Sequence, residues 1–300
     1  MRGLLALLAL AATPVAAQGP SKPEPVTTPG SGKWPATYEA VPALPAHVVY
    51  RPRDLSTLGA RKLGIYVFGN GGCSADGTSS RNHLLDIASR GYLAIAPGTI
   101  PDKSKPEPQR SGPPGRLTAA TPASALKEAI DWAIAENGRA GSPLEGRIDP
   151  DRIAISGFSC GGLQALMNAD DPRVRTIVVM NSGVFNKQPG AIEGIRVGKD
   201  AIGRLHGSAL YVLGGPTDIA YANGMDDYRR IGGIPAAVVN IPVGHGGTYM
   251  QPNGGIAAEV VGAWLEWQLW YDQAAARRFT GPDCGFCRDP RLTIERKNIP

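Results

Sequence analysis

Runs of apolar and β-branched residues recur along the chain, and each one ends in glycine, proline or another turn-forming residue. Several of these runs are apolar on both faces, which is typical of strands that helices cover on both sides of a sheet. The runs expected to form strands are residues 46–52, 62–70, 92–98, 152–157, 174–183, 208–215 and 236–244.

Helical patterns lie between these runs. Residues 124–137 follow a serine cap and place four apolar side chains on or near one face: Leu126, Ile130, Trp132 and Ile134. Residues 256–272 are expected to form a second, more apolar helix. Strands that alternate with helices through right-handed crossovers form a mostly parallel sheet. The sequence therefore predicts an α/β fold of three layers around one central sheet.

Two segments of this pattern have alternative interpretations. Trp264, Trp267 and Trp270 are regularly spaced in the last helix, as in a ligand platform, but packing against the sheet is the favoured interpretation. The proline-rich connection 98–121 leaves the carboxyl end of a strand, where such sheets bind ligands. It forms either one rim of a site or an inert surface loop.

The start of the chain is not expected to belong to the fold. An early arginine, an apolar run and a small-residue cleavage site indicate a secretory signal peptide at residues 1–17, so export to the periplasm or the medium is expected. Residues 18–45 are rich in proline, serine, threonine and glycine, which predicts an extended or poorly ordered leader. A single domain is expected over residues 46–300, with a cysteine-containing tail from about residue 273.

The charge pattern narrows the class of partner. The net charge of +5 is spread along the chain, without the basic stripe and interleaved aromatic residues that nucleic-acid binding requires. After the first residues no apolar run is long enough to span a bilayer. We therefore expect an exported protein without a nucleic-acid partner or a membrane span, and nothing in the sequence indicates more than a monomer.

The chain has four cysteines. An even number in an exported protein predicts two disulfides, with three possible connectivities. Cys284 and Cys287 lie together in the tail and are expected to pair, which leaves Cys73 and Cys160. A redox role for the tail pair is disfavoured because a C-x-x-C redox site belongs at a helix amino terminus in a small βαβ domain. A zinc site is disfavoured because no histidine lies nearby.

The stretch GFSCG at residues 157–161 is a G-x-S-x-G pattern between a predicted strand and a predicted helix. In that position the glycines relieve crowding in a sharp turn, and the turn lifts the hydroxyl of Ser159 above the sheet. A serine hydroxyl is a weak nucleophile at neutral pH, so it needs a base, and the base needs an acid that orients it.

His245 is the expected base, because it lies between glycines directly after the last predicted strand. The other three histidines, His47, His83 and His206, lie within or before regular elements and are expected to be structural. The acid is expected after the preceding strand, where Asp218 follows a Gly-Gly-Pro turn. The alternatives to this acid, Asp226 and Asp227, lie in a predicted helix and are expected to face solvent.

An oxyanion that forms at this serine needs two backbone N–H donors. One is expected from Cys160, and the other from Gly72 in the glycine-rich loop after residues 62–70, with Gly71 or Cys73 as alternatives. If the two amides converge on one oxygen, Cys73 and Cys160 lie close enough for a disulfide that holds the oxyanion hole in shape. The alternative is a pair of free, half-buried thiols.

These motifs together resemble the α/β-hydrolase superfamily over nearly all of the mature chain: GFSCGG, FGNGGC, GGPTDIAY and VGHGG. Within it the chain is similar to the branch of dienelactone hydrolases, chlorophyllases and cutinase-like polyester hydrolases. The resemblance implies ester hydrolysis through an acyl-serine, without metal or cofactor, with Ser159 as nucleophile, His245 as base and Asp218 as orienting acid. Two departures weaken the transfer of a substrate: Asn70 stands where histidine is usual, and Cys160 where Met, Gln or Arg is commoner.

The sequence thus predicts an exported serine esterase for carboxylic esters of small to medium acyl chain, with a small-molecule or polymeric ester as substrate. A polyester or amide hydrolase with the same residues is the near alternative, and a non-catalytic binding protein of the same fold is the remote one. No long insertion after residues 174–183 indicates a lid, so an open site is expected. The residues expected to line it are Asn181, Ser182, Phe185, Ile219 and Tyr221.

Overall fold

The computed structural model describes residues 26–102, 104, 117–187 and 190–300. The predicted signal peptide, the first part of the predicted leader and most of the proline-rich connection lie outside these residues. None of the helices in the described ranges is both long and apolar enough to cross a bilayer.

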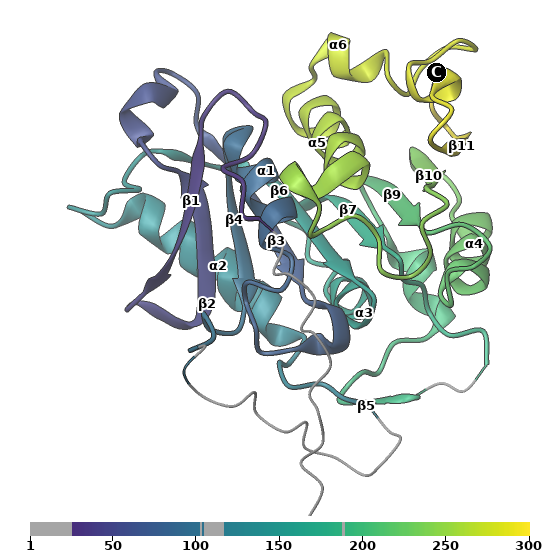
Figure 1. Cartoon of the computed structure of the whole chain (residues 1–300), viewed down its shortest axis with the longest axis horizontal. Coiled ribbons are helices and arrows are strands. Elements are labelled where there is room, and N and C mark those ends of the chain that lie inside the picture. Colours follow the sequence, from purple (N-terminus) through teal and green to yellow (C-terminus); the bar gives the residue numbers. More distant parts are fainter. Residues whose placement is uncertain (1–25, 103, 105–116, 188–189) are drawn as a thin grey trace, which may run out of the picture.

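A nine-stranded sheet forms the centre of the fold, in the order β1-β2-β4-β3-β6-β7-β9-β10-β11 (Figure 1). The strands from β4 to β10 run parallel, and β1, β2 and β11 pair antiparallel at the edges. The predicted α/β fold with a mostly parallel sheet is therefore confirmed. The strands are β1 Ala36–Val41, β2 Leu44–Pro52, β3 Leu63–Gly69, β4 Tyr92–Pro97, β6 Ile148–Phe158, β7 Val174–Met180, β9 Ser208–Leu213, β10 Ala236–Asn240 and β11 Thr293–Lys297, with β5 Leu117–Thr118 and β8 Ile192–Glu193 as a separate pair.

Helices cover both faces of the sheet, because alternate side chains of each strand point to opposite faces. In β3, Ile65 and Val67 belong to the core beneath α2, α3 and α4, whereas Tyr66 and Phe68 belong to the core beneath α1 and α5. One apolar run therefore supplies two cores. The helices are α1 Arg81–Ser89, α2 Ser124–Gly138, α3 Cys160–Met167, α4 Tyr221–Arg230, α5 Gly255–Trp270 and α6 Gln273–Ala276, with short 3₁₀ turns at η1 Leu55–Leu58, η2 Gly71–Cys73, η3 Lys199–Arg204, η4 Pro252–Gly254 and η5 Phe286–Arg288.

The sheet begins and ends outside the predicted strands. β1 lies in the expected leader and pairs antiparallel with β2, so the expected domain start at residue 46 is too late. β11 lies in the expected tail and pairs antiparallel with β10. Both are edge strands, which contact a neighbour on one side only and carry polar residues toward water. Their sequences therefore lack the apolar runs that mark the central strands.

The tryptophans of α5 pack into the structure rather than forming an exposed platform. Trp264 is fully buried, and its indole N–H donates to Thr176 Oγ1 at 2.8 Å. Trp267 and Trp270 are half-buried against the same core, and the guanidinium of Arg61 lies 3.6 Å from the ring centre of Trp270. These contacts agree with the favoured interpretation from the sequence.

A buried hydrogen-bond chain crosses the sheet beneath α1. Ser156 Oγ donates to Val178 O at 2.8 Å, and Tyr66 Oη donates to Ser156 Oγ at 2.9 Å. The 2.9 Å contact between His83 Nε2 and Tyr66 Oη then requires the imidazole to be the donor. Its other nitrogen, Nδ1, has no partner among the described residues. Burial therefore lowers the pKa of His83 to about 4.

This arrangement predicts an acid-sensitive fold. The unfolded state binds a proton at His83 near the ordinary imidazole pKa, whereas the folded state resists it until about pH 4, so stability falls as pH decreases across that window. We expect His83 to account for a loss of about 3 kcal/mol between neutral pH and its folded pKa. Urea unfolding at several pH values should show a shallower pH dependence for His83→Gln than for the wild type. Equal slopes would contradict the assignment.

Candidate active site

Three predicted site residues lie at the carboxyl ends of parallel strands. Ser159 occupies the turn between β6 and α3, Asp218 follows β9, and His245 follows β10. Because β6, β7, β9 and β10 are consecutive in the sheet, their carboxyl ends meet at one edge. The structure therefore brings together residues that are up to 86 positions apart in the sequence.

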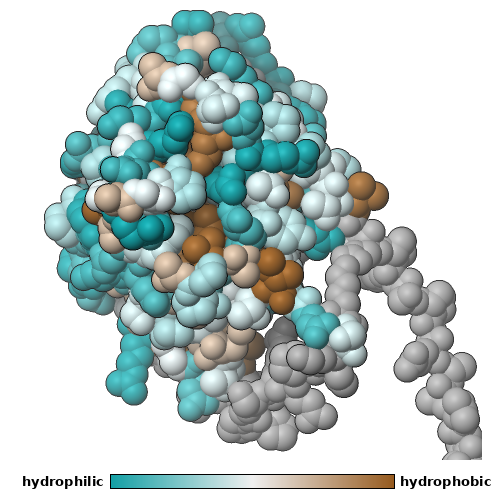
Figure 2. All heavy atoms as spheres, turned by 90° about the vertical axis from the view of Figure 1, so that its left-hand side faces the viewer, coloured by the Kyte–Doolittle hydropathy of each residue, from teal (hydrophilic) through white to brown (hydrophobic). Residues whose placement is uncertain are grey.

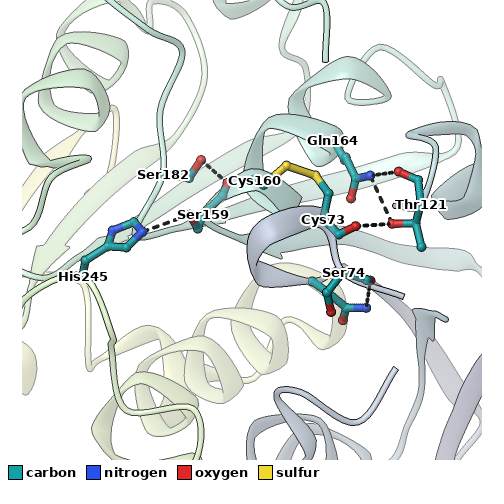
Figure 3. The surroundings of a disulfide bond; sticks show 9 residues. Cys73, Ser74, Thr121, Ser159, Cys160, Gln164, Ser182 and His245 are labelled. Carbon is teal, nitrogen blue, oxygen red and sulfur yellow. Dashed lines mark hydrogen bonds between the residues drawn. A yellow bond between two sulfur atoms is a disulfide. The ribbon is translucent and has the colours of Figure 1, made fainter. Parts of the chain in front are cut away.

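The three side chains form a continuous hydrogen-bonded line. Ser159 Oγ lies 2.9 Å from His245 Nε2 (Figure 3), and His245 Nδ1 lies 2.6 Å from Asp218 Oδ1. A carboxylate only accepts hydrogen bonds, so Nδ1 carries the proton in the neutral imidazole. Nε2 is then free to accept the serine proton, as a general base requires.

Asp218 is buried and fully engaged as an acceptor. Its Oδ1 also accepts from the Ala220 N–H at 2.9 Å, and its Oδ2 accepts from the Gly214 N–H at 3.0 Å and from Asn181 Nδ2 at 2.9 Å. Burial raises the pKa of Asp218, but the hydrogen bonds from His245 and these three donors outweigh it and hold the pKa below its ordinary value. The carboxyl group is therefore anionic at neutral pH.

The other acids and histidines considered from the sequence have different partners. Asp226 pairs with Arg230 at 2.8 Å and with Lys199 at 2.9 Å. Asp227 was expected to face solvent, and that prediction is wrong: the side chain is fully buried, and its Oδ1 contacts Lys199 Nζ at 2.6 Å. It points inward because it caps the Val184 N–H at 2.7 Å, a contact that the helical pattern does not reveal.

The remaining histidines contact structural groups. His47 and His83 are buried in the fold, and the ring Nε2 of His47 lies 2.9 Å from Ala125 O. His206 Nε2 lies 3.1 Å from Asp171 O. Neither of these contacts, nor that of His83 with Tyr66, involves the hydrogen-bonded triad of Ser159, His245 and Asp218.

The serine turn is conformationally strained. Ser159 has φ 53° and ψ −119°, a combination that side chains other than glycine rarely adopt. Glycines make the surrounding approach possible: a Cβ on Gly161 would lie 2.0 Å from Gly69 O, and one on Gly157 would lie 2.2 Å from Gly161 O. The loop after β3 can therefore pack directly against the first turn of α3.

A disulfide joins this loop to the serine turn. Cys73 and Cys160 are bonded, with their Cα atoms 5.2 Å apart, and both side chains are buried (Figure 3). The second pair, Cys284 with Cys287, is bonded within the tail, and the described chain has no free cysteine. Both pairings are those expected from the sequence.

Two backbone N–H groups close to the disulfide in sequence have no acceptor among the described residues. Among the described residues, the N–H groups of Cys160 and Gly72 donate to no protein acceptor. The alternative donor Cys73 is occupied, because its N–H donates to Asn70 O at 3.1 Å. Gly72 has φ 63°, which glycine adopts without strain and which turns the backbone of the loop. An oxyanion hole is built from backbone donors that are free in this way.

Two residues that the sequence analysis did not select, Thr121 and Gln164, support the glycine-rich loop after β3, called the oxyanion loop below. The N–H of Thr121 donates to Cys73 O at 3.1 Å, and Gln164 Nε2 donates to Thr121 O at 2.6 Å (Figure 3). Gln164 lies on α3 and Thr121 at the end of the long connection, so Thr121 links the loop at Cys73 to the helix. No local sequence signal reveals these contacts, because their partners lie 43 and 48 residues away.

The residues expected to line the site divide into two groups. Asn181 and Ser182 are buried, and Ser182 Oγ donates to Ser159 O at 2.7 Å, so both support the triad from behind. Phe185 and Tyr221 are half-buried, whereas Ile219 is 80% exposed. Only these last three keep surface that a substrate could contact.

Two further apolar side chains next to the triad were not selected from the sequence. Phe158 packs 5.5 Å from the ring of His245, measured between ring centres. Val243 is 48% exposed and lies two residues before His245. Phe158 therefore gives the histidine an apolar neighbour, and Val243, like Ile219, is an exposed apolar residue close to a triad residue in the sequence.

Two cavities lie elsewhere on the described chain. One of about 450 Å³ includes Asp86, Arg90 and Glu259, and one of about 650 Å³ lies between β2 and α2 with Leu44 and Trp132. Neither cavity is lined by a triad residue.

The face of the molecule on the β1 side is mainly hydrophilic, with apolar residues gathered in a narrow band (Figure 2). Within the described ranges, no three His, Cys, Asp or Glu side chains cluster as metal ligands would.

Removing the Cys73–Cys160 disulfide is expected to reduce both stability and turnover. Opening a loop of 87 residues should lower the free energy of unfolding by about 4–5 kcal/mol. On the sequence prediction of ester hydrolysis, loosening the two expected oxyanion donors should lower kcat for an ester by about 10-fold to 100-fold. The matched control is Cys284→Ser with Cys287→Ser, which opens a short loop and should cost about 2 kcal/mol without changing kcat. Equal losses of kcat in both double variants would contradict this prediction.

No protein-family model matches the sequence, and a search of curated proteins finds no match.

Proposed function

We propose that this chain is a serine hydrolase of the α/β-hydrolase type that cleaves carboxylic esters of small to medium acyl chain. The observation that carries the proposal is the line from Ser159 Oγ through His245 to Asp218, with contacts of 2.9 Å and 2.6 Å. The chain order of serine, acid and histidine, the strand-to-helix turn at the serine and the loop after β3 support the same assignment.

The proposed reaction begins with attack of Ser159 Oγ on the ester carbonyl carbon, while His245 Nε2 takes the hydroxyl proton. The carbonyl oxygen becomes an oxyanion that accepts from the N–H groups of Cys160 and Gly72. The tetrahedral intermediate collapses, the protonated imidazole gives its proton to the leaving alcohol, and an acyl-serine remains. Water, deprotonated by the same Nε2, then releases the acid and restores the hydroxyl. Asp218 stays ionised throughout and orients the imidazole.

A polymeric ester is a second candidate substrate. Ile219 and Val243 are exposed apolar residues beside Asp218 and His245, and such residues suit contact with an apolar polymer surface. The two disulfides are consistent with an extracellular protein. Export through a signal peptide at residues 1–17 is part of this proposal.

The test is covalent labelling followed by a substrate series. The purified protein is treated with a fluorophosphonate, and the adduct is located by peptide mass spectrometry. We expect the adduct on Ser159, together with turnover of p-nitrophenyl esters that depends on acyl-chain length and on this serine. Release of soluble products from a polyester film would extend the substrate class. A protein that shows neither adduct nor turnover would overturn the proposal in favour of a non-catalytic binding protein.

A further inference from the structure

Asn181 lies directly after β7, behind the acid of the triad. It has φ 42°, in the left-handed region, and its N–H donates to Val212 O at 2.7 Å. Its side chain is buried. A non-glycine residue held in this region needs support from its surroundings, and such strain is concentrated at functional sites. In this conformation the Asn181 side chain points toward Asp218, as its contacts show.

The Asn181 amide connects the two turns that carry Asp218 and His245. Its Nδ2 donates to Asp218 Oδ2 at 2.9 Å and to Gly244 O at 3.1 Å. Gly244 immediately precedes His245, so a single NH₂ group holds the acid and the backbone of the base. Both hydrogens of the amide are used in this way.

Tyr249 determines which way the amide points. Its hydroxyl donates to Asn181 Oδ1. A flipped amide would place its oxygen against the carboxylate of Asp218 and the carbonyl of Gly244, and its NH₂ against a hydroxyl donor. The hydroxyl of Tyr249 therefore favours the one orientation in which Asn181 can donate to both turns.

The phenol ring of Tyr249 is itself fixed by its neighbours. The ring is buried, packs edge-on to His83 at 5.8 Å and lies 4.5 Å from Phe158, measured between ring centres. Phe158 in turn lies 5.5 Å from the ring of His245. The tyrosine is thus held against the same aromatic side chain that packs on the base.

From these contacts we infer that Asn181 and Tyr249 are positioning residues for the triad. They act through Asp218 and His245 and do not touch the reacting atoms. This inference rests on the proposed function, because it assigns a kinetic role that exists only if Ser159, His245 and Asp218 catalyse hydrolysis. Its consequence is that deleting one remote hydroxyl changes kcat while leaving substrate binding unchanged.

The experiment compares Tyr249→Phe with Tyr66→Phe in a p-nitrophenyl ester assay and in the rate of fluorophosphonate labelling. Tyr66 is an equally buried tyrosine on the same face of the sheet, and its hydroxyl contacts Ser156 and His83 rather than the triad. We expect Tyr249→Phe to lower kcat and the labelling rate by about 3-fold to 10-fold with KM unchanged. Tyr66→Phe should keep kcat within about twofold of the wild type.

A second variant, Asn181→Ala, removes the amide and should lower kcat by about 100-fold. If Asn181→Ala does not fold, the comparison of Tyr249→Phe with Tyr66→Phe still tests the inference. The inference is overturned if Tyr249→Phe keeps the wild-type kcat, or if Tyr66→Phe loses as much, because general loosening would then explain the effect. A wild-type protein that neither labels nor turns over ester overturns the proposed function itself, and the two failures are thereby distinguishable.

Discussion

Replacing Ser159 with alanine is expected to lower kcat for a p-nitrophenyl ester by about 10⁶-fold and to abolish fluorophosphonate labelling. The acyl-enzyme cannot form without the hydroxyl, and only the oxyanion donors and substrate binding then remain to accelerate hydrolysis. These should leave a residual acceleration of about 10³-fold to 10⁴-fold over water. KM should change little, because the hydroxyl contributes mainly to the transition state.

The control for this variant is Ser156→Ala. Ser156 is a buried serine on the same strand, and its hydroxyl donates to Val178 O rather than contacting the histidine. Its removal should lower stability by about 1 kcal/mol and leave labelling at Ser159 intact. Retention of ester turnover in Ser159→Ala would show that another group in the protein is the nucleophile.

The central sheet and the triad could be predicted from the sequence because each carries a local signal. β3 and the second half of β6, residues 153–157, are buried on both faces, and their ends are marked by glycine-rich turns. Parallel strands place such turns at one edge, so strand order was enough to bring Ser159, Asp218 and His245 into one candidate site. The pairing of Cys73 with Cys160 followed from the same reasoning, since Cys73 adjoins Gly72 and Cys160 is itself the other expected oxyanion donor.

The edge strands could not be predicted because their stabilising partner lies on one side only. β11 contains three charged residues in the sequence TIERK, so its pattern is that of a solvated tail. Its pairing with β10 depends on backbone hydrogen bonds that any sequence can make. β1 likewise pairs with β2 through its backbone, although prolines surround it in the sequence.

Asn181 shows a second limit of sequence reasoning. Its position after β7 placed it at the correct end of the sheet, but the direction of its side chain depends on the sign of φ. A positive φ turns the amide inward to Asp218, whereas an extended backbone would aim it elsewhere. Thr121 and Gln164 were missed for a different reason: Thr121 reaches Cys73 O, and Gln164 reaches Thr121, only once the long connection has returned to the sheet.

Replacing Asp218 with asparagine is expected to lower kcat by about 10⁴-fold at neutral pH. Asparagine keeps the shape of the side chain but can donate a hydrogen bond to His245 Nδ1, which would leave the proton on Nε2. The imidazole would then face Ser159 with a donor and could not accept its proton. Because the anion that stabilises the imidazolium is also lost, the rate of fluorophosphonate labelling at Ser159 should fall in parallel.

The matched controls are Asp226→Asn and Asp227→Asn, the two acids that the sequence offered as alternatives. Asp226 lies in half-buried ion pairs at the surface of α4, so its replacement should change stability by no more than about 1 kcal/mol and leave kcat unchanged. Asp227 is buried beside Lys199, and burial raises its pKa to about 6. Asp227→Asn should therefore alter the pH dependence of unfolding between its ordinary pKa and about pH 6, where the wild type loses stability as the pH rises. A loss of kcat in either control that equals the loss in Asp218→Asn would show that the acid of the triad is not the residue that contacts His245 Nδ1.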